Sequence, residues 1–409
     1  MSSLSGQPAA PPSSDYRFVV IAAWMIPHVF GFILLESLGL MLPSINEEFH
    51  LSPFEEGVLG SAPRVGMMLL ALPAGWWLSN LSAKRVTTVT FVAGALLVVL
   101  QGWSRSFYLL LLARAMYGIT MVIREPVRAM LVRQWALPRE VVIVNALSNM
   151  LWGVTAAGFM LVPILLKVLD NDWRTTFYIF ALGILGLTLI WQVLGKERVS
   201  PQYLAQMRAQ TRSPLSSIIR YKELWFLALG LIGNSAAWSA FAVFWPTLML
   251  EQYGIEEFTS GAIIAIGGGV SAFAGIGVGL LTNRFGKKRV ILWWCGLAMA
   301  ATQVGFLWTG SFGLLILLTA VNGVAWSYFP ITLSIPFQLP DIKPREIATA
   351  IGFLETAVWA GALVGPILTG ALEQYALDAR FSLLVSSAMP VSLSIAAMLL
   401  PRKWDELTV

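Results

Sequence analysis

Ionisable side chains interrupt several long apolar stretches of this sequence, and they are its first candidates for chemistry. A charge held in the middle of a bilayer costs at least about 2.5–3.5 kcal/mol on insertion scales, so such residues are expected to have a partner or a function. The full set is His28, Glu36, Arg64, Arg114, Arg124, Glu125, Arg128 and Glu355. Arginine outnumbers glutamate in this set, and His28 is expected to be a hydrogen-bonded core residue.

Three of these residues are expected at a common depth. At a rise of about 1.5 Å per residue, Glu36, Arg64 and Arg114 each lie roughly 10–14 Å from the same end of their helices. We therefore predict an ion pair between Glu36 and Arg64, with Arg114 nearby. The pair serves either proton coupling or packing alone, and for Arg114 a structural or proton-linked role is favoured over contact with a ligand.

A second group lies a similar distance from the other end. Arg124 and Arg128 share one helix face and are predicted to form a two-pronged clamp for an anion. The alternative for Arg128 is a side chain that reaches the lipid headgroups. Glu125 continues the face of Arg114, and Glu355 is the only acid in the apolar stretches of the second half. Both acids are candidates for proton coupling, and Glu355 is also a candidate for contact with Arg124.

Two aromatic stripes at helical spacing form a further constellation. The first comprises Asn234, Trp238, Phe241 and Trp245, and the second comprises Asn322, Trp326 and Phe329, followed by Pro330. Residues at such spacing share one face of a helix, and Pro330 is expected to bend its helix. The residues alone leave two alternatives open, which are ordinary packing and the wall of a ligand cavity.

The elements that position these residues are expected to be membrane-spanning helices. Of 409 residues 57% are hydrophobic and 12% charged, whereas a soluble domain has about 25% charged residues. A span needs roughly 20 apolar residues. Runs of this kind occur near 17–43, 55–79, 84–104, 107–132, 140–169, 174–195, 222–250, 259–283, 288–310, 312–337, 347–373 and 380–400. The sequence thus predicts an all-α membrane protein with twelve spans.

The charges between the spans predict which side is which. Lys and Arg gather in the even-numbered connections and the C-terminal tail, and the odd-numbered connections are acidic. By the positive-inside rule both termini and the central connection are cytoplasmic. The net charge of +5 is therefore a signal of topology, and it does not require a nucleic-acid partner.

The only long hydrophilic interruption divides the spans six and six. We predict a disordered cytoplasmic tail at 1–16, an N-terminal bundle at 17–195, a cytoplasmic linker at 196–221, a C-terminal bundle at 222–400 and a cytoplasmic tail at 401–409. The first segment lacks the short apolar core of a signal peptide. No Cys/His cluster, nucleotide-binding glycine motif or catalytic constellation occurs, so neither a cofactor nor an enzymatic activity is expected.

The two halves of the chain are related by a repeat. Pro43 matches Pro246 and Arg174 matches Arg380, and these offsets differ only slightly (246 − 43 = 203; 380 − 174 = 206). The turn GWWLSNLSAKRV, which starts at Gly75, matches GLLTNRFGKKRV, which starts at Gly279. Two parallel six-helix repeats describe one architecture of membrane transporters.

The second turn resembles the connection between helices two and three of the major facilitator superfamily, which reads Gly-x-Leu-x-Asp-Arg-x-Gly-Arg/Lys-Lys/Arg. The first copy matches this pattern at Gly75, Lys84 and Arg85. The second copy matches it at Gly279, Arg284, Gly286, Lys287 and Lys288, and has Asn283 where the family has Asp. The resemblance implies that these turns gate the cytoplasmic side. The family Asp is missing from both copies, so we expect the first turn to be held by packing and by hydroxyl or amide hydrogen bonds.

The resemblance also implies a fold and a function. It implies two pseudo-symmetric six-helix bundles that work by alternating access, with helices 1, 4, 7 and 10 around the cavity. The expected partners are a small-molecule substrate, a proton or other ion gradient and membrane lipid. The protein is expected to be a monomer in the plasma membrane. Arginine excess and aromatic walls favour a small organic anion as the substrate. The alternatives are proton-driven export of lipophilic or cationic compounds, and a sensor that does not transport.

Overall fold

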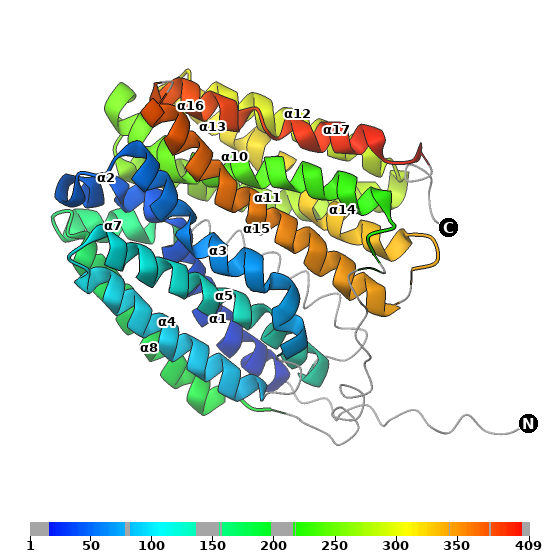
Figure 1. Cartoon of the computed structure of the whole chain (residues 1–409), viewed down its shortest axis with the longest axis horizontal. Helices are drawn as coiled ribbons and strands as arrows, with labels where there is room; N and C mark the ends of the chain where they lie inside the picture. The colour runs from blue at the N-terminus through cyan, green and yellow to red at the C-terminus, as the bar shows by residue number, and fades with distance from the viewer. Residues whose placement is uncertain are drawn as a thin grey trace, which may run out of the picture.

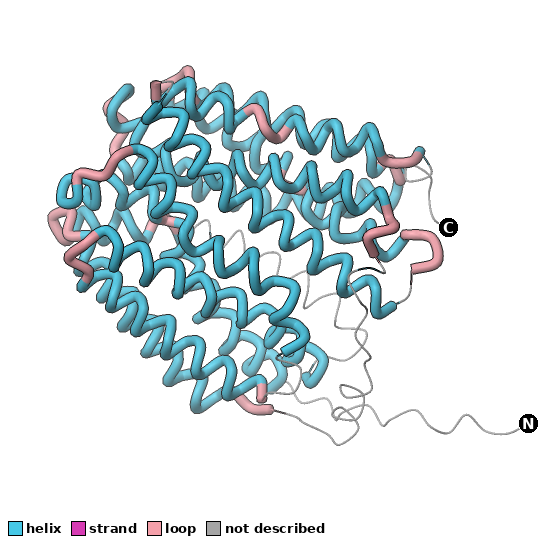
Figure 2. Tube along the Cα trace, viewed as in Figure 1, coloured by secondary structure: helices cyan, strands magenta, loops and turns pink. Residues whose placement is uncertain are grey.

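The structure of the chain is a computed structural model, and it describes residues 16–77, 82–135, 155, 158–197, 216, 218–342, 344–375 and 378–402. Within these ranges the chain is helical with short connections and contains no strand (Figure 2). The expected tails at 1–16 and 401–409 and the expected linker at 196–221 lie almost wholly outside the described residues.

The described part of the N-terminal half contains seven helices. They are α1 (Tyr16–Glu36), α2 (Leu38–Phe49), α3 (Pro53–Trp77), α4 (Ala83–Trp103), α5 (Phe107–Trp135), α7 (Leu161–Val168) and α8 (Trp173–Leu194). The first expected span is divided between α1 and α2 at Ser37, whose hydroxyl donates to the Ile33 carbonyl at 2.5 Å. This side-chain bond competes with the helical hydrogen bonds around it and accompanies the break.

The C-terminal half follows the same plan. Its helices are α10 (Lys222–Tyr253), α11 (Glu257–Phe285), α12 (Lys288–Phe306), α13 (Phe312–Ala325), α14 (Tyr328–Ser334), η4 (Ile335–Gln338), α15 (Pro344–Tyr375), α16 (Ala379–Ser387) and α17 (Val391–Leu399). The tenth expected span breaks between α13 and α14 at Trp326 and Ser327. Pro330 lacks a backbone N–H for the Trp326 carbonyl, so the predicted bend is confirmed.

Ten helical stretches of the described residues are long and apolar enough to cross a membrane. Two further spans were expected, of which one is α3 and the other, near 140–169, is only partly described. Large apolar side chains such as Leu96, Leu182 and Phe273 point outward and are more than 60% exposed. Such a surface suits lipid rather than water. The chain is an integral membrane protein, and the twelve-helix count is consistent with this structure.

The helices form two bundles that lie side by side, one from each half of the chain (Figure 1). Helices α3 and α15 run antiparallel along the boundary, with the Ser61 hydroxyl donating to the Leu363 carbonyl at 2.7 Å. The start of α1 and the end of α17 lie on one side, which we call the terminal face (Figure 1). The opposite side, where α2 ends and α3 begins, we call the distal face.

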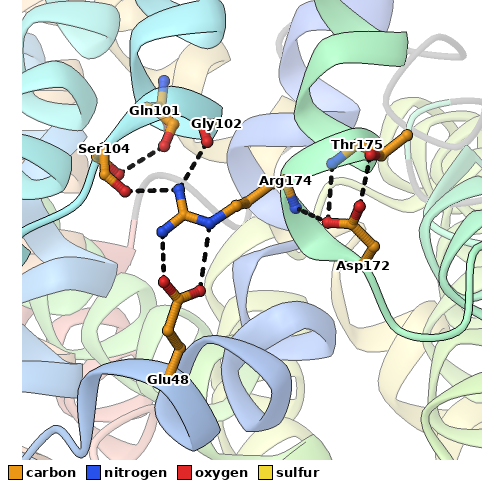
Figure 3. Close-up of polar contacts among 7 residues, drawn as sticks. All are labelled: Glu48, Gln101, Gly102, Ser104, Asp172, Arg174 and Thr175. Carbon is orange, nitrogen blue, oxygen red and sulfur yellow. Dashed lines mark hydrogen bonds and ion pairs between the residues drawn. The ribbon is translucent and has the colours of Figure 1, made fainter.

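A partly exposed arginine corner lies at the distal end of the N-terminal bundle (Figure 3). The Arg174 guanidinium donates to both oxygens of Glu48, at 2.5 and 3.2 Å. It also donates to the carbonyls of Gly102 and Ser104, at 2.7 and 2.5 Å, and lies over the Trp173 ring. One side chain therefore joins α2, the end of α4 and the start of α8.

The C-terminal bundle repeats this corner. Arg380 donates to the Gln252 carboxamide and to the Tyr253 hydroxyl, and its guanidinium lies over the rings of Tyr253 and Trp308. The contacts keep the spacing of the sequence repeat (380 − 174 = 206; 252 − 48 = 204). The two halves are thus pseudo-symmetric in side-chain contacts as well as in helix order.

Candidate functional site

The two bundles touch most closely near the distal face. A side chain at Gly39 of α2 would collide with the Ala242 carbonyl of α10. A side chain at Gly57 of α3 would likewise collide with the Pro366 carbonyl of α15. Glycine alone permits such backbone-to-backbone approach. At the terminal face the ends of α3 and α15 lie apart (Figure 1). The structure is therefore closed at its distal face.

Glu36 and Arg64 form the predicted ion pair just below this closed region. Arg64 Nη2 donates to both carboxylate oxygens of Glu36 at 2.7 Å, and both side chains are more than 90% buried. Arg64 Nη1 also reaches the carbonyl of Gly60, which packs against Val243 of the other bundle. The pair thus belongs to the N-terminal bundle but lies at its boundary with the C-terminal one.

Arg114 lies beside this pair and cross-links three helices. Its guanidinium is 1% exposed and donates to the carbonyls of Leu35 and Leu59 at 3.2 and 3.3 Å. A third hydrogen bond reaches Gln101 Oε1 of α4 at 3.4 Å. All three acceptors are neutral, so Arg114 keeps its charge uncompensated by direct pairing. The contacts match the structural role expected for this residue.

Arg124 points into the N-terminal bundle. Nη2 donates to the Thr90 carbonyl at 2.8 Å, Nη1 contacts Met121 Sδ at 3.1 Å, and the guanidinium lies 4.4 Å from the centre of the Phe91 ring. These contacts occupy the group that was expected to clamp an anion with Arg128 or to meet Glu355. In this conformation Arg124 has these partners in place of Glu355, and the anion clamp stays a prediction. Arg128 is partly buried on the same helix, and the side chain of Glu125 lies outside the described set.

Tyr117 lies between Arg114 and Arg124 on α5 and was missed by the sequence analysis. It lies three residues after Arg114 on α5, and its hydroxyl donates to the Gly31 carbonyl of α1 at 3.0 Å. Its helical spacing from Arg114 was the available signal. Gln101 was missed as well, because a single amide inside an apolar run does not indicate which residue its side chain contacts.

The predicted aromatic residues meet in one continuous contact between α10 and the α13–α14 break. The rings of Trp238 and Trp326 lie 5.1 Å apart at nearly a right angle. Phe241 stacks on Trp245 at 4.8 Å, and both are buried against Phe306. Phe241 and Trp245 therefore serve as packing in this conformation. Trp238, Trp326 and Phe329 are only partly buried and form the accessible part of the stripe.

Polar groups hold this aromatic cluster in place. The Trp326 indole N–H donates to Asn322 Oδ1 at 3.1 Å, and Asn322 Nδ2 donates to the Thr302 hydroxyl at 2.7 Å. The Tyr328 hydroxyl lies against the Asn234 side chain. The sequence indicated both asparagines, whereas Thr302 and Tyr328 are found only through the fold.

Glu355 lies on α15 and is partly buried. Ser61 pairs with Leu363, and Leu72 lies beside Gly352, so Glu355 falls nearer to the terminal face than Arg64 does. It lies in the C-terminal half at a different level from the Glu36–Arg64 pair. The structure therefore places Glu36 and Glu355, two of the three acids named as candidates for coupling, at different levels.

The first of the two repeated turns is held by a carboxylate from elsewhere in the chain. The Ser82 hydroxyl caps α4 by accepting the Arg85 N–H, and it donates to Glu197 Oε2 at 2.6 Å. Glu197 Oε1 accepts the Lys84 N–H at 3.0 Å. The expected hydroxyl hydrogen bond is confirmed, but the partner, Glu197, was not predicted. Gly75 lies in the last turns of α3, and residues 78–81 are outside the described ranges.

The second turn uses a left-handed backbone at two successive residues. Gly286 has φ of +70° and Lys287 has φ of +37°, and Lys288 then begins α12. Glycine adopts this conformation without strain, which explains the Gly of the motif at Gly286. Gly279, Asn283 and Arg284 lie on α11, but the contacts of their side chains are outside the described set, so their gating role stays a prediction.

Among the side chains that the structure describes, no three His, Cys, Asp or Glu residues are grouped to hold a metal ion. The site is instead a boundary between two bundles. It has a buried ion pair and further arginines on one side, and an aromatic cluster with amide support on the other. Two repeated bundles, closed at one end around such a boundary, define a transporter that moves its substrate between two sides of a membrane.

The family follows from comparison with known proteins. The profile of the Major Facilitator Superfamily matches residues 24–366, and the chain belongs to this family. It is 24% identical over 402 residues to the uncharacterized transporter YybO of Bacillus subtilis, covering 89% of each chain. Monocarboxylate transporter 11 of Mus musculus is 26% identical, with 98% of this chain and 90% of that protein covered. The D-galactonate transporter of Escherichia coli is 20% identical, with 88% and 89% covered.

Solved structures agree on the fold. The nucleoside transporter NupG superposes with a TM-score of 0.73 at 16% identity, covering 94% of this chain and 98% of that one. A bacterial homologue of the human lysosomal transporter Spinster, in an inward-facing and unoccupied conformation, gives 0.72 at 16% identity, covering 94% and 95%. The chain therefore has the fold of the Major Facilitator Superfamily and is a transporter rather than an enzyme.

Proposed function

We propose that this transporter carries a small organic anion by alternating access and that a proton gradient drives it. The observation that carries the proposal is the charge balance of the N-terminal bundle. Among its described side chains, Arg64, Arg114 and Arg124 are buried within the membrane, and Glu36 is the one carboxylate paired with them. The hydrogen bonds of Arg114 and Arg124 end on neutral acceptors, so their charges are not cancelled.

Uncompensated charge of one sign favours a ligand of the other sign. In a medium of low dielectric constant the field of buried arginines is weakly screened and extends to the boundary between the bundles. In the other half, the partly buried Trp238 and Trp326 offer apolar surface to the organic part of a substrate. A carboxylate with a small organic body fits both requirements.

The Glu36–Arg64 pair supplies a route for coupling. When Glu36 takes up a proton, Arg64 Nη2 loses its charged partner and becomes available to a substrate carboxylate. When the proton leaves, Glu36 regains Arg64 and displaces the substrate. A proton and an anion are thereby carried in the same direction. The relatives named as transporters of D-galactonate and of monocarboxylates, which are organic acids, support the anion class.

The placement in the cell is part of the proposal. We place the chain in the plasma membrane as a monomer, with both termini cytoplasmic. The terminal face carries described basic residues such as Lys84, Arg85 and Arg289, and the distal face carries acids such as Glu47 and Glu48, as the positive-inside rule requires. The halves at 17–195 and 222–400 are the two bundles that move relative to each other.

Uptake into proteoliposomes under an imposed pH gradient tests the function. We expect pooled organic anions to accumulate when the outside is acidified. Glu36→Gln is expected to abolish this accumulation while leaving exchange of substrate across the membrane, since Arg64 stays available without a proton. Accumulation that ignores the pH gradient would show that protons do not drive transport.

A second candidate is proton-driven export of lipophilic or cationic compounds. It is favoured by the Trp238–Trp326 contact, because indole faces bind cations. The same proteoliposomes distinguish the two functions, since an exporter of this kind would move lipophilic cations and leave organic anions untouched.

A further inference from the structure

Three carboxylates from both halves lie near the closed distal face. Glu56 lies in the first turn of α3, Glu251 near the end of α10 and Glu373 near the end of α15. The charges of Glu251 and Glu373 both act on Glu56, and Glu373 also faces Asp378. We call Glu56, Glu251 and Glu373 the distal acidic triad. Neither the charge balance nor the coupling route proposed above uses it.

Glu56 is the buried member of the triad. It is 7% exposed, and no hydrogen bond to its carboxyl group is found within the described ranges. Its neighbour Glu55 has a different role, because it accepts the N–H and the hydroxyl of Ser52 at the start of the helix. Glu56 is therefore a largely buried acid that feels the charges of two other acids.

The basic side chains nearby are engaged elsewhere. Arg380, two residues after Asp378, donates to Gln252 and Tyr253, and Arg174 is held by Glu48. The positive end of the α3 dipole favours an anion at Glu56 only weakly. Desolvation of a buried carboxylate costs more than the dipole returns, and repulsion from Glu251 and Glu373 adds to that cost. The ionised form of Glu56 is thus disfavoured while the distal face is closed.

The closed face leaves little room for the three groups to separate. Gly57, next to Glu56, packs against the Pro366 carbonyl, and Gly370, three residues before Glu373, packs against the Pro53 carbonyl. Glu56 and Glu373 are therefore held together by backbone contacts between α3 and α15. Glu251 is exposed, so the triad is open to protons from the medium at the distal face.

We propose that the distal acidic triad is a proton-binding site formed by closure of the distal face and dissolved by its opening. Closure brings Glu56 beside Glu251 and Glu373 and takes up a proton from the distal side. Opening separates the two halves, rehydrates Glu56 and releases the proton. The site lies apart from the Glu36–Arg64 pair, where the carboxylate already has a charged partner.

The sign of the pH effect follows by linkage. The closed form binds more protons than the open form, so closure is favoured at low pH and lost as pH rises. For one proton the ratio of closed to open molecules changes by up to about tenfold per pH unit. A triad that stayed ionised in both forms would give no such dependence.

Pulsed electron spin resonance between the two halves tests the proposal without any substrate. Spin labels on Tyr108→Cys and Phe312→Cys, which are exposed near the distal face of each half, report its closure. The single native cysteine, Cys295, is replaced by serine. In lipid nanodiscs we expect the short-distance population to dominate at acidic pH and the long-distance population to grow at alkaline pH.

Variants identify the group that responds. Glu56→Gln mimics the protonated form and is expected to keep the distal face closed at every pH, and Glu373→Gln is expected to weaken the pH response. Glu47→Gln is the matched control, because Glu47 is an exposed distal carboxylate in the repeat position of Glu251 (251 − 47 = 204). A wild type without a pH response, or a Glu56→Gln protein with the full response, overturns the proposal. Neither result bears on which substrate is carried.

Discussion

At the scale of single residues, three buried arginines of one bundle are stabilised in different ways. Arg64 has a carboxylate, Arg114 has carbonyls from two helices and a carboxamide, and Arg124 has a carbonyl and an aromatic ring. Guanidinium suits all three settings because it is planar, has five donors and keeps its charge. The same residue type thus supplies ion pairing, cross-linking and positive potential.

Breaking the Glu36–Arg64 pair from one side is expected to destabilise the protein. Arg64→Gln leaves Glu36 buried without its cationic partner, and breaking a buried pair from one side costs about 3–5 kcal/mol. The double variant Glu36→Gln with Arg64→Gln removes both charges and is expected to recover most of this stability. Thermal unfolding of the purified variants measures the difference. If the double variant is as unstable as Arg64→Gln, the loss comes from packing and not from an unpaired charge.

The depth of these residues could be predicted from sequence, but their direction could not. A fixed rise per residue places Glu36 and Arg64 at one level, so their pairing followed from span boundaries alone. Arg124 depends on which helix packs beside it, and its partners Thr90 and Phe91 lie on α4, more than 30 residues away in the chain. Helical spacing shows on which face of its helix a side chain lies, but tertiary packing decides which helix that face contacts.

At the scale of elements, apolar length predicted the spans, and local chemistry decided where they break. The bend near Pro330 follows from a missing N–H, so the sequence was sufficient. The break at Ser37 has no such marker, because serine is common within helices. The hydrogen bonds of Glu197 to Ser82 and to the N-terminus of α4 could not be predicted either, because Ser82 and Glu197 are 115 residues apart.

The N-cap of α8 is expected to stabilise the protein in a pH-dependent way. Asp172 caps the helix by accepting the N–H groups of Arg174 and Thr175 and the hydroxyl of Thr175. Burial opposes ionisation of Asp172, but these hydrogen bonds outweigh it and lower the pKa of its carboxyl group. Stabilisation by Asp172 is therefore present above the pKa of the unfolded chain and is lost as pH falls through the folded pKa.

We expect Asp172→Ala to lose about 1 kcal/mol at neutral pH, as other caps do, and to lose less in acid. Asp172→Asn is the control, because asparagine caps a helix without titrating. Thermal midpoints at neutral and acidic pH measure both effects. An Asp172→Ala penalty that is unchanged in acid would mean that the charge plays no part in the cap.

At the scale of the whole molecule, the backbone contacts found between the described parts of the two bundles lie at the distal end. Gly39, Gly57 and Gly370 bring helices of opposite halves into direct contact at the distal face. Alternating access requires this contact to break while each bundle keeps its own core. Most of the distal contact therefore rests on small residues, which separate without unfolding either half.

Substitution of one such glycine predicts how the molecule changes state. In Gly57→Ala the new methyl group meets the Pro366 carbonyl, and backbone on the opposite half has no freedom to move away while the distal face is closed. We expect the population to shift toward the distal-open form, with slower transport and nearly unchanged stability, because the clash lies between bundles and not within one.

The Tyr108–Phe312 label distance and the uptake rate measure this shift. Gly269→Ala on α11 is the control, since a methyl group there has no atom within 4 Å. If both variants transport and report distances like the wild type, close approach at Gly57 is not what holds the distal face closed.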